Sequence, residues 1–167
     1  MALFFVVCCP YPVIVGVFNK IVTRLNALRS NSTALKNIRP IVIVDDDEED
    51  HMMLDEYFCA VGINDKVTFL INGQLALQYL ESIEDPSQLP KLMVLDLNMP
   101  ILTGSQVLMQ IKETPRLKDI PVIIFSTSVN ENEKKKCLGC GALEYLVKPI
   151  TWEEGDRIAK RFASFVT

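Results

Sequence analysis

The stretch of sequence that decides the fold is Ile41-Val42-Ile43-Val44-Asp45-Asp46, four apolar residues followed by two acids. Further short apolar runs end in the same way on a polar residue. They are Leu92-Met93-Val94-Leu95 before Asp96, Val122-Ile123-Ile124-Phe125 before Ser126, and Tyr145-Leu146-Val147 before Lys148-Pro149. The first three runs are apolar at successive positions, which is typical of parallel strands that helices cover on both faces. The pattern therefore predicts a parallel sheet.

Segments with helical periodicity alternate with these runs. The expected strands are 41–44, 67–71, 92–95, 122–125 and 145–147, and the expected helices are 48–61, 74–83, 105–112, one capped by Asn130 and one beginning at Trp152. Glu133 and Glu154 are placed to complete capping boxes with Asn130 and Thr151. Connections of this length allow right-handed crossovers. The predicted fold class is α/β, a three-layer sandwich with a doubly wound, five-stranded parallel sheet.

Polar residues at the ends of these strands are expected to meet. Parallel strands all point the same way, and open α/β folds bind ligands at the edge where the carboxyl ends lie. The residues expected there are the acids Asp45, Asp46 and Asp96, the hydroxyl of Ser126 and the ammonium of Lys148. Acids this close repel one another unless a cation intervenes, and Mg²⁺ is usually held by one or two carboxylates plus phosphate. The edge therefore predicts a magnesium site beside a carboxylate that can be phosphorylated.

Each of these residues also has a simpler interpretation. An aspartate after a strand is often only a helix cap or turn former. Ser126 can cap a turn, and Lys148 can be a solvated surface charge. The joint occurrence favours the site, because all the strand ends that carry these residues lie on the edge that parallel topology selects.

Length and charge separate the chain into two parts. Its 167 residues favour one domain with an appendage. Residues 1–39 have five basic residues and no acid, so they carry +5; since the total is −4, residues 40–167 carry −9. A domain this acidic is unsuited to nucleic acid, whose binding relies on neutralising phosphates. The acidity fits a metal site and protein partners.

The N-terminal part, residues 1–39, is expected to be an apolar extension followed by a basic linker, before a domain over 40–167. Residues 2–18 are apolar apart from Pro10, Pro12 and Gly16, at the short limit for a membrane span. No positive charge precedes them, so they lack the start of a secretory signal. Membrane contact by residues 1–20 is less favoured than a hydrophobic helix, an extension without function or a disordered segment, because prolines weaken a short span.

The cysteines do not predict a disulfide framework, since there are five and the domain is not small. Cys137 and Cys140 have the spacing of half a zinc or redox motif. A zinc site would need a second pair of ligands, and a redox pair should follow a strand at the start of a helix. Packing of small residues at a helix end is the favoured interpretation.

These motifs together resemble the receiver domain of two-component response regulators, the CheY-like family. The segments that carry the resemblance are Val44-Asp45-Asp46-Asp47, Leu95-Asp96-Leu97-Asn98-Met99-Pro100, Thr103-Gly104, Phe125-Ser126-Thr127, Gly141-Ala142 and Tyr145-Leu146-Val147-Lys148-Pro149-Ile150. They occur in order and cover about residues 40–167. The resemblance implies the flavodoxin-like strand order 2-1-3-4-5.

The resemblance also implies a role for each acid. Asp96 would be the phosphoacceptor, taking its phosphoryl group from a phosphohistidine on a sensor histidine kinase or a phosphotransfer protein. Asp46 and Asp96 would ligate Mg²⁺ directly, with the main-chain carbonyl of Asn98 as a third protein ligand. Asp45 would act through a metal-bound water.

Lys148 would bind the phosphoryl group, and the peptide bond between Lys148 and Pro149 would be cis, a form tolerated before proline. Ser126 stands where many members of the family have threonine, and it keeps the hydroxyl. It would move toward the phosphoryl group while Tyr145 swings inward, a two-state switch set by local charge. Tyr145 could instead simply pack.

The implied function is that of a stand-alone, cytoplasmic signalling domain rather than an enzyme, with any membrane tether supplied by the N-terminal segment. A downstream protein would recognise the face formed by the helix after Asn130, strand 145–147 and the helix from Trp152. An alternative is an adaptor on the same fold that does not depend on phosphorylation. A phosphatase of the aspartyl-nucleophile class ranks last, because Asn98 occupies the position of the second aspartate it needs.

Overall fold

The computed structural model describes residues 40–166, so the predicted extension and linker, 1–39, lie outside the described residues. The predictions of a membrane anchor and of a basic linker therefore remain predictions. Within residues 40–166, no helix is both long and apolar enough to cross a membrane.

The sheet has five parallel strands in the order β2-β1-β3-β4-β5, as predicted. The strands are β1 (Ile41–Val44), β2 (Val67–Leu70), β3 (Leu92–Leu95), β4 (Val122–Ser126) and β5 (Glu144–Val147). The helices are α2 (Glu48–Val61), α3 (Gly73–Ser82), α4 (Gly104–Glu113), α5 (Glu131–Gly139) and α6 (Trp152–Ala163), with short 3-10 turns at Asn64–Lys66 and Pro86–Gln88. The predicted fold class is confirmed.

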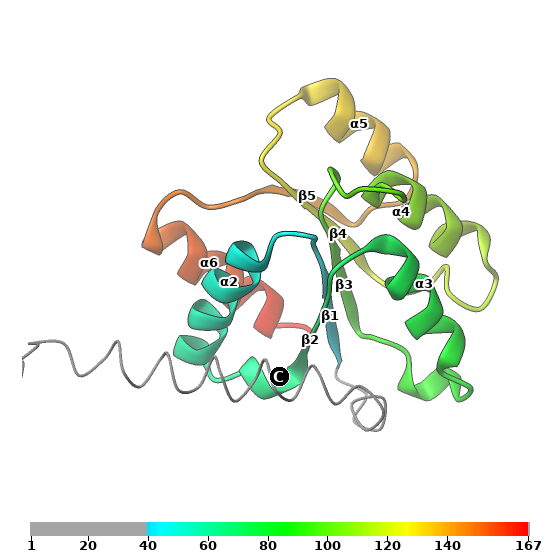
Figure 1. The fold of residues 1–167 in the computed structure, drawn as a ribbon, viewed down its shortest axis with the longest axis horizontal. Helices are drawn as coiled ribbons and strands as arrows, with labels where there is room; N and C mark the ends of the chain where they lie inside the picture. The colour runs from blue at the N-terminus through cyan, green and yellow to red at the C-terminus, as the bar shows by residue number, and fades with distance from the viewer. Residues whose placement is uncertain (1–39, 167) are drawn as a thin grey trace, which may run out of the picture. The chain divides into compact units, whose positions relative to one another are not determined.

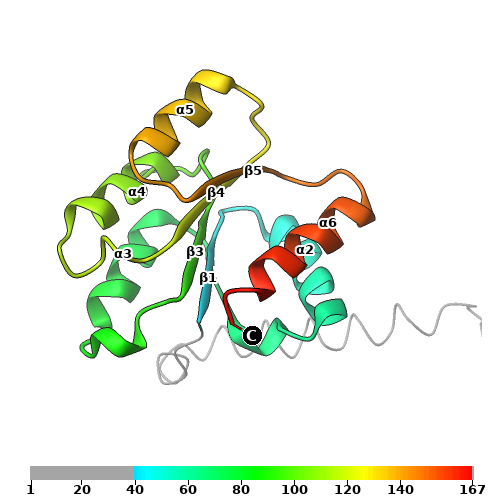
Figure 2. The ribbon, with the colours of Figure 1, turned by 180° about the vertical axis from the view of Figure 1, so that it is seen from behind.

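Helices cover both faces of the sheet and make three layers. Helices α2 and α6 lie on one face, and α3, α4 and α5 lie on the other (Figure 1; Figure 2 shows the same arrangement from behind). Ile41 and Ile43 pack into the core under α2 and α6, whereas Val42 and Val44 pack under the other three helices. Because side chains alternate across a strand, a strand with helices on both faces must be apolar at every position.

Both predicted capping residues are found, but neither predicted capping box closes. Asn130 caps α5 by accepting from the backbone N–H of Glu133, while the Glu133 carboxylate accepts from the Ser128 hydroxyl at 2.6 Å. Thr151 caps α6, and the Glu154 carboxylate accepts from the N–H of the residue before Thr151. The prediction of reciprocal bonds is wrong because each glutamate carboxylate accepts from another nearby donor and not from the backbone N–H of the capping residue.

Burial inside the helices follows the helical period. Leu54, Tyr57 and Phe58 of α2 are buried, whereas Met52 is 50% exposed. At 100° per residue, Met52 lies about 200° around the helix from Leu54, so the two cannot share the inward face. Cys137 packs in the core beneath α5, and burial raises the pKa of its thiol, which suits packing rather than redox chemistry.

The contact between α2 and α6 requires glycine at position 155. A Cβ atom placed there would lie 2.0 Å from Cζ of Tyr57, whose ring is buried and lies 4.7 Å from the ring of Trp152. We expect Gly155→Ala to lower the free energy of unfolding by about 2 kcal/mol, because the overpacking cost exceeds the gain in helix propensity. Urea unfolding measures it.

The control for this substitution is Gly139→Ala near the end of α5, where a Cβ would meet nothing within 4 Å. This variant should be as stable as the wild type or slightly more stable, since alanine favours the helix. Equal stability of the two variants would contradict the role assigned to the packing of Tyr57 against Gly155.

Candidate functional site

The predicted site residues converge on one edge of the sheet, which we call the carboxyl edge. They are Asp45 and Asp46 after β1, Asp96 after β3, Ser126 as the last residue of β4, and Lys148 after β5. The pairing of Val44 with Leu95 and of Ser126 with Val147 aligns these strand ends. Ligand oxygens of Asp45, Asp46 and Asp96 can all lie within 4.8 Å of one another. The parallel register therefore gathers the three acids.

Lys148 lies among the carboxylates and joins three of them. Its Nζ atom is 2.7 Å from Oδ2 of Asp45 and 3.2 Å from Oδ1 of Asp96. It is also 2.5 Å from Oδ2 of Asp50, a residue in the first turn of α2 that the sequence analysis missed. The sequence did hold a clue to this contact. Helix α2 begins directly after the paired acids, so its first turn, with Asp50, must lie near the carboxyl edge.

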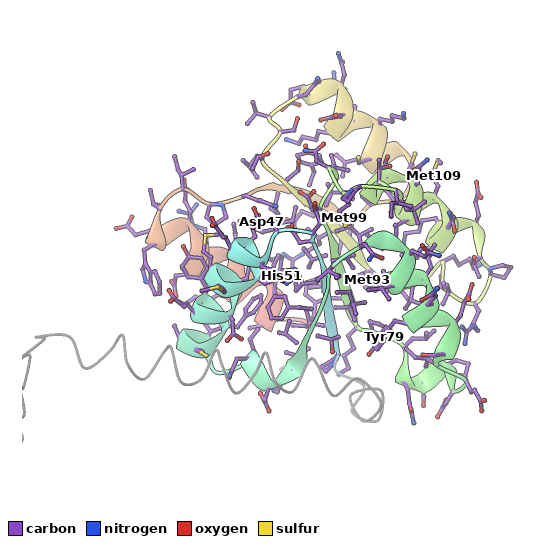
Figure 3. All side chains as sticks on the ribbon, in the orientation of Figure 1. Asp47, His51, Tyr79, Met93, Met99 and Met109 are labelled. Carbon is purple, nitrogen blue, oxygen red and sulfur yellow. The ribbon has the colours of Figure 1, made fainter. Side chains whose placement is uncertain are left out.

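Backbone N–H groups hold two of the acids in place. The N–H of Asn98 donates to Oδ2 of Asp96 at 2.6 Å, which leaves Oδ1 facing Lys148. The N–H of Asp47 donates to Oδ1 of Asp45 at 3.0 Å, and Asp47 itself caps α2. Figure 3 shows Asp47 at this end of the sheet. Asp96 is thus oriented with one oxygen bonded to the backbone and the other toward the ammonium.

Burial and charge oppose each other in the site. Burial raises the pKa of Asp45, although the hydrogen bonds from Lys148 and from the Asp47 backbone work against the rise. Burial alone would lower the pKa of Lys148, but its hydrogen bonds to Asp45 and Asp50 and the charges of Asp45 and Asp96 together outweigh burial and raise it. Four carboxylates and one ammonium meet here, those of Asp45, Asp46, Asp50, Asp96 and Lys148. The excess of oxygen ligands and negative charge fits a divalent cation such as Mg²⁺.

Ser126 and Tyr145 are linked to each other through one loop residue. Ser126 is fully buried, and its Oγ accepts from the N–H of Ser128 at 3.2 Å. Tyr145 is 8% exposed, and its hydroxyl donates to the carbonyl of Ser128 at 2.9 Å. The side chain of Tyr145 therefore lies inward, and the loop between β4 and α5 connects it to Ser126.

The peptide bond between Lys148 and Pro149 is trans, since the part of the chain from 40 to 166 has no cis peptide. The prediction of a cis bond is wrong for this structure. The two isomers before proline differ by only about 0.5–1 kcal/mol, so local sequence does not decide between them and the surrounding packing can select either.

The raised pKa of Lys148 predicts how stability changes in alkali. A group whose pKa rises on folding stabilises the fold fully below its unfolded pKa of 10.5 and loses that contribution as the pH rises through the folded value. In metal-free buffer at pH 8 we expect Lys148→Met to melt roughly 5–10 °C below the wild type, because the carboxylates lose their counter-charge. The gap should narrow above pH 10.5. A difference in melting temperature that stays constant as the pH rises through 10.5 would contradict a raised pKa for Lys148.

With this geometry in view, comparison with known proteins identifies the class. The family of response regulator receiver domains matches residues 41–160. The chain therefore belongs to this family, and it carries one such domain. Receiver domains are signalling domains of two-component systems and are not generally classed as enzymes.

Two relatives show the breadth of the match. The probable methanogenesis regulatory protein FilR2 of Methanothrix harundinacea is 30% identical over 75% of this chain and 81% of its own length. The two-component response regulator ORR8 of rice, Oryza sativa, is 32% identical over 72% of this chain and 94% of its own length.

Two solved structures are similar in fold and sequence. The Mn²⁺-bound form of response regulator Rcp1 has a TM-score of 0.64 at 30% identity, over 75% of this chain and 91% of that one. The phosphorylated cyanobacterial phytochrome response regulator RcpA has a TM-score of 0.65 at 30% identity, with the same coverage. Both support the assignment of this chain to the receiver family.

Proposed function

We propose that this domain accepts a phosphoryl group on Asp96, from a phosphohistidine of a sensor histidine kinase or phosphotransfer protein. The observation that carries the proposal is the orientation of Asp96, with Oδ2 bonded to the Asn98 N–H and Oδ1 facing the Lys148 ammonium. The related RcpA structure is of a phosphorylated protein. Such a source of phosphoryl groups fits a cytoplasmic location.

The metal implied by the family fits the residues present. Asp46, Asp96 and the main-chain carbonyl of Asn98 would hold Mg²⁺ directly, and Asp45 would act through a bound water. The related Rcp1 structure contains Mn²⁺, which favours the same oxygen ligands. Bound there, the ion supplies positive charge that offsets the charge of the transferring phosphoryl group.

The residues of the chain itself supply the rest of the transfer. Oδ1 of Asp96 forms a bond to phosphorus as the bond from phosphorus to the histidine nitrogen breaks, and that electron pair stays on the imidazole. The Lys148 ammonium then donates a hydrogen bond to a phosphoryl oxygen. Within residues 40–166 the Ser126 Oγ accepts from the N–H of Ser128, and its own hydrogen can donate to a second phosphoryl oxygen. Positioned charges of this kind stabilise phosphoryl transfer.

Phosphorylation would be read out through the loop between β4 and α5. A movement of Ser126 toward the phosphoryl group pulls on Ser128, to which the Tyr145 hydroxyl is also bonded. The face of α5, β5 and α6 lies beside this loop and carries the exposed apolar residues Leu138, Val147 and Trp152. We assign this face to a downstream protein partner, with Ser126 and Tyr145 as the switch.

Incubation with Mg²⁺ and a small phosphodonor such as acetyl phosphate tests the proposal. We expect one phosphoryl group per chain, labile in alkali as an acyl phosphate is, and no labelling when a chelator removes the metal. Mass spectrometry of the intact protein measures it. An unlabelled chain, under conditions in which another receiver domain is labelled, would refute phosphoryl acceptance.

A further inference from the structure

The Lys148 ammonium lies at unequal distances from its three carboxylate neighbours. An ammonium has three N–H donors and no acceptor, and here three carboxylates lie within reach. The contact with Asp50 is the shortest at 2.5 Å, and the contact with Asp96 is the longest at 3.2 Å. In this structure the ammonium therefore lies closer to Asp50 and Asp45 than to the proposed phosphoacceptor, and it donates a hydrogen bond to Asp50.

Asp50 differs from the other two partners in its exposure. Its side chain is 22% exposed, against 2% for Asp45 and 6% for Asp96. A carboxylate that already meets water can be separated from its counter-ion at lower cost than a buried one. When the ammonium has to turn to a new anion, Asp50 is thus the partner that it can leave most easily.

We propose that Asp50 is a positioning residue that holds the Lys148 ammonium in the unphosphorylated state and competes with the phosphoryl group for it. The proposal rests on the proposed function, because it concerns the regulation of the same site. The competition sets how strongly the domain favours its phosphorylated form. It also couples phosphorylation to the start of α2, since Asp50 lies in the first turn of that helix.

The affinity for beryllofluoride, a mimic of the phosphoryl group, tests the competition. In saturating Mg²⁺, we expect Asp50→Asn to bind beryllofluoride roughly fivefold more tightly than the wild type, the factor that corresponds to one part-exposed ion pair. Glu49→Gln is the matched control, since it removes the same charge from an exposed side chain in the same turn of α2. It should change the affinity by less than about twofold.

The same variants can be compared without metal or phosphoryl mimic. In the metal-free protein, the ¹⁵N and ¹H signals of the Lys148 ammonium should shift in Asp50→Asn and stay unchanged in Glu49→Gln. Unchanged signals in Asp50→Asn would show that Asp50 does not hold the ammonium. Beryllofluoride affinity in Asp50→Asn that is equal to or weaker than that of the control would equally overturn the proposal.

These outcomes separate the two proposals. A wild type that binds no beryllofluoride, while the Lys148 signals still respond to Asp50→Asn, would refute phosphoryl acceptance and leave Asp50 as a purely structural partner of the lysine. A wild type that binds the mimic, while Asp50→Asn behaves like Glu49→Gln, would retain phosphoryl acceptance and refute competition by Asp50.

Discussion

Replacing Asp96 with asparagine should reduce labelling by a small phosphodonor by roughly a hundredfold or more, because a carboxamide is not a nucleophile and the acceptor is lost outright. The fold should persist. Asparagine keeps an oxygen that can accept from the N–H of Asn98, as Oδ2 of Asp96 does at 2.6 Å. Loss of one carboxylate also relieves repulsion in the acidic cluster, so the melting temperature should not fall.

The matched control is Asp47→Asn, which removes an acid at the same edge that lies outside the cluster of Asp45, Asp46 and Asp96. Asp47 caps α2 with its side chain, and asparagine caps as well as aspartate does, so labelling should stay within about twofold of the wild type. Full labelling of Asp96→Asn would mean that another residue is the acceptor.

The Asp96→Asn variant also distinguishes a phosphorylation-dependent switch from an adaptor. If signalling depends on phosphorylation, a partner captured by the beryllofluoride-treated wild type should not be captured by Asp96→Asn treated in the same way. Equal capture by both proteins, with signalling intact, would favour an adaptor that uses the receiver fold without phosphoryl transfer.

Gly104→Ala should be the most destabilising of the glycine substitutions considered, because a Cβ at this position meets backbone rather than a side chain. It would lie 2.0 Å from the carbonyl oxygen of Asp96 and 3.2 Å from Cα of Leu97. The chain after β3 would have to move for α4 to keep its place. We expect the free energy of unfolding to fall by about 3 kcal/mol or more, as measured by urea unfolding.

This substitution should also impair the site in the molecules that still fold. Any shift that relieves the clash moves the backbone of Asp96, whose side chain must stay in reach of Lys148. Labelling per folded molecule should therefore fall, whereas Gly155→Ala, whose added Cβ meets the Tyr57 ring and not the backbone of Asp96, should leave it unchanged. A stability within about 1 kcal/mol of the wild type would show that the turn relaxes cheaply.

The central strands were predictable because their environment leaves little choice. Every residue of β1 and β3 is buried, so an apolar residue is required at each position. The edge strands were less well predicted. Strand β2 ends one residue earlier than expected, and β5 begins one residue earlier, at Glu144. Edge strands meet water on one side, so their sequences are less constrained.

Other features needed the tertiary structure. Glu133 and Glu154 each bind a donor that a local capping rule does not include, and Met52 faces water although it lies in an apolar stretch. The peptide bond before Pro149 is trans, although the resemblance to the receiver family implied a cis bond. The donors bonded to the two glutamates lie only five and four residues away, so the capping rule fails on local loop geometry and not on a distant neighbour.

By itself, the sequence determined which strands form, that they run parallel, and that Asp45, Asp46, Asp96 and Lys148 meet at one edge. Topology alone brings the strand ends together, so the residue types at those ends are enough to predict which side chains meet. Only the tertiary structure showed that Asp50, 98 residues away in the chain, binds Lys148 more closely than Asp96 does. The physical reason is that a side-chain contact depends on where a helix lies over the sheet edge, which the packing of α2 against β1 and α6 decides.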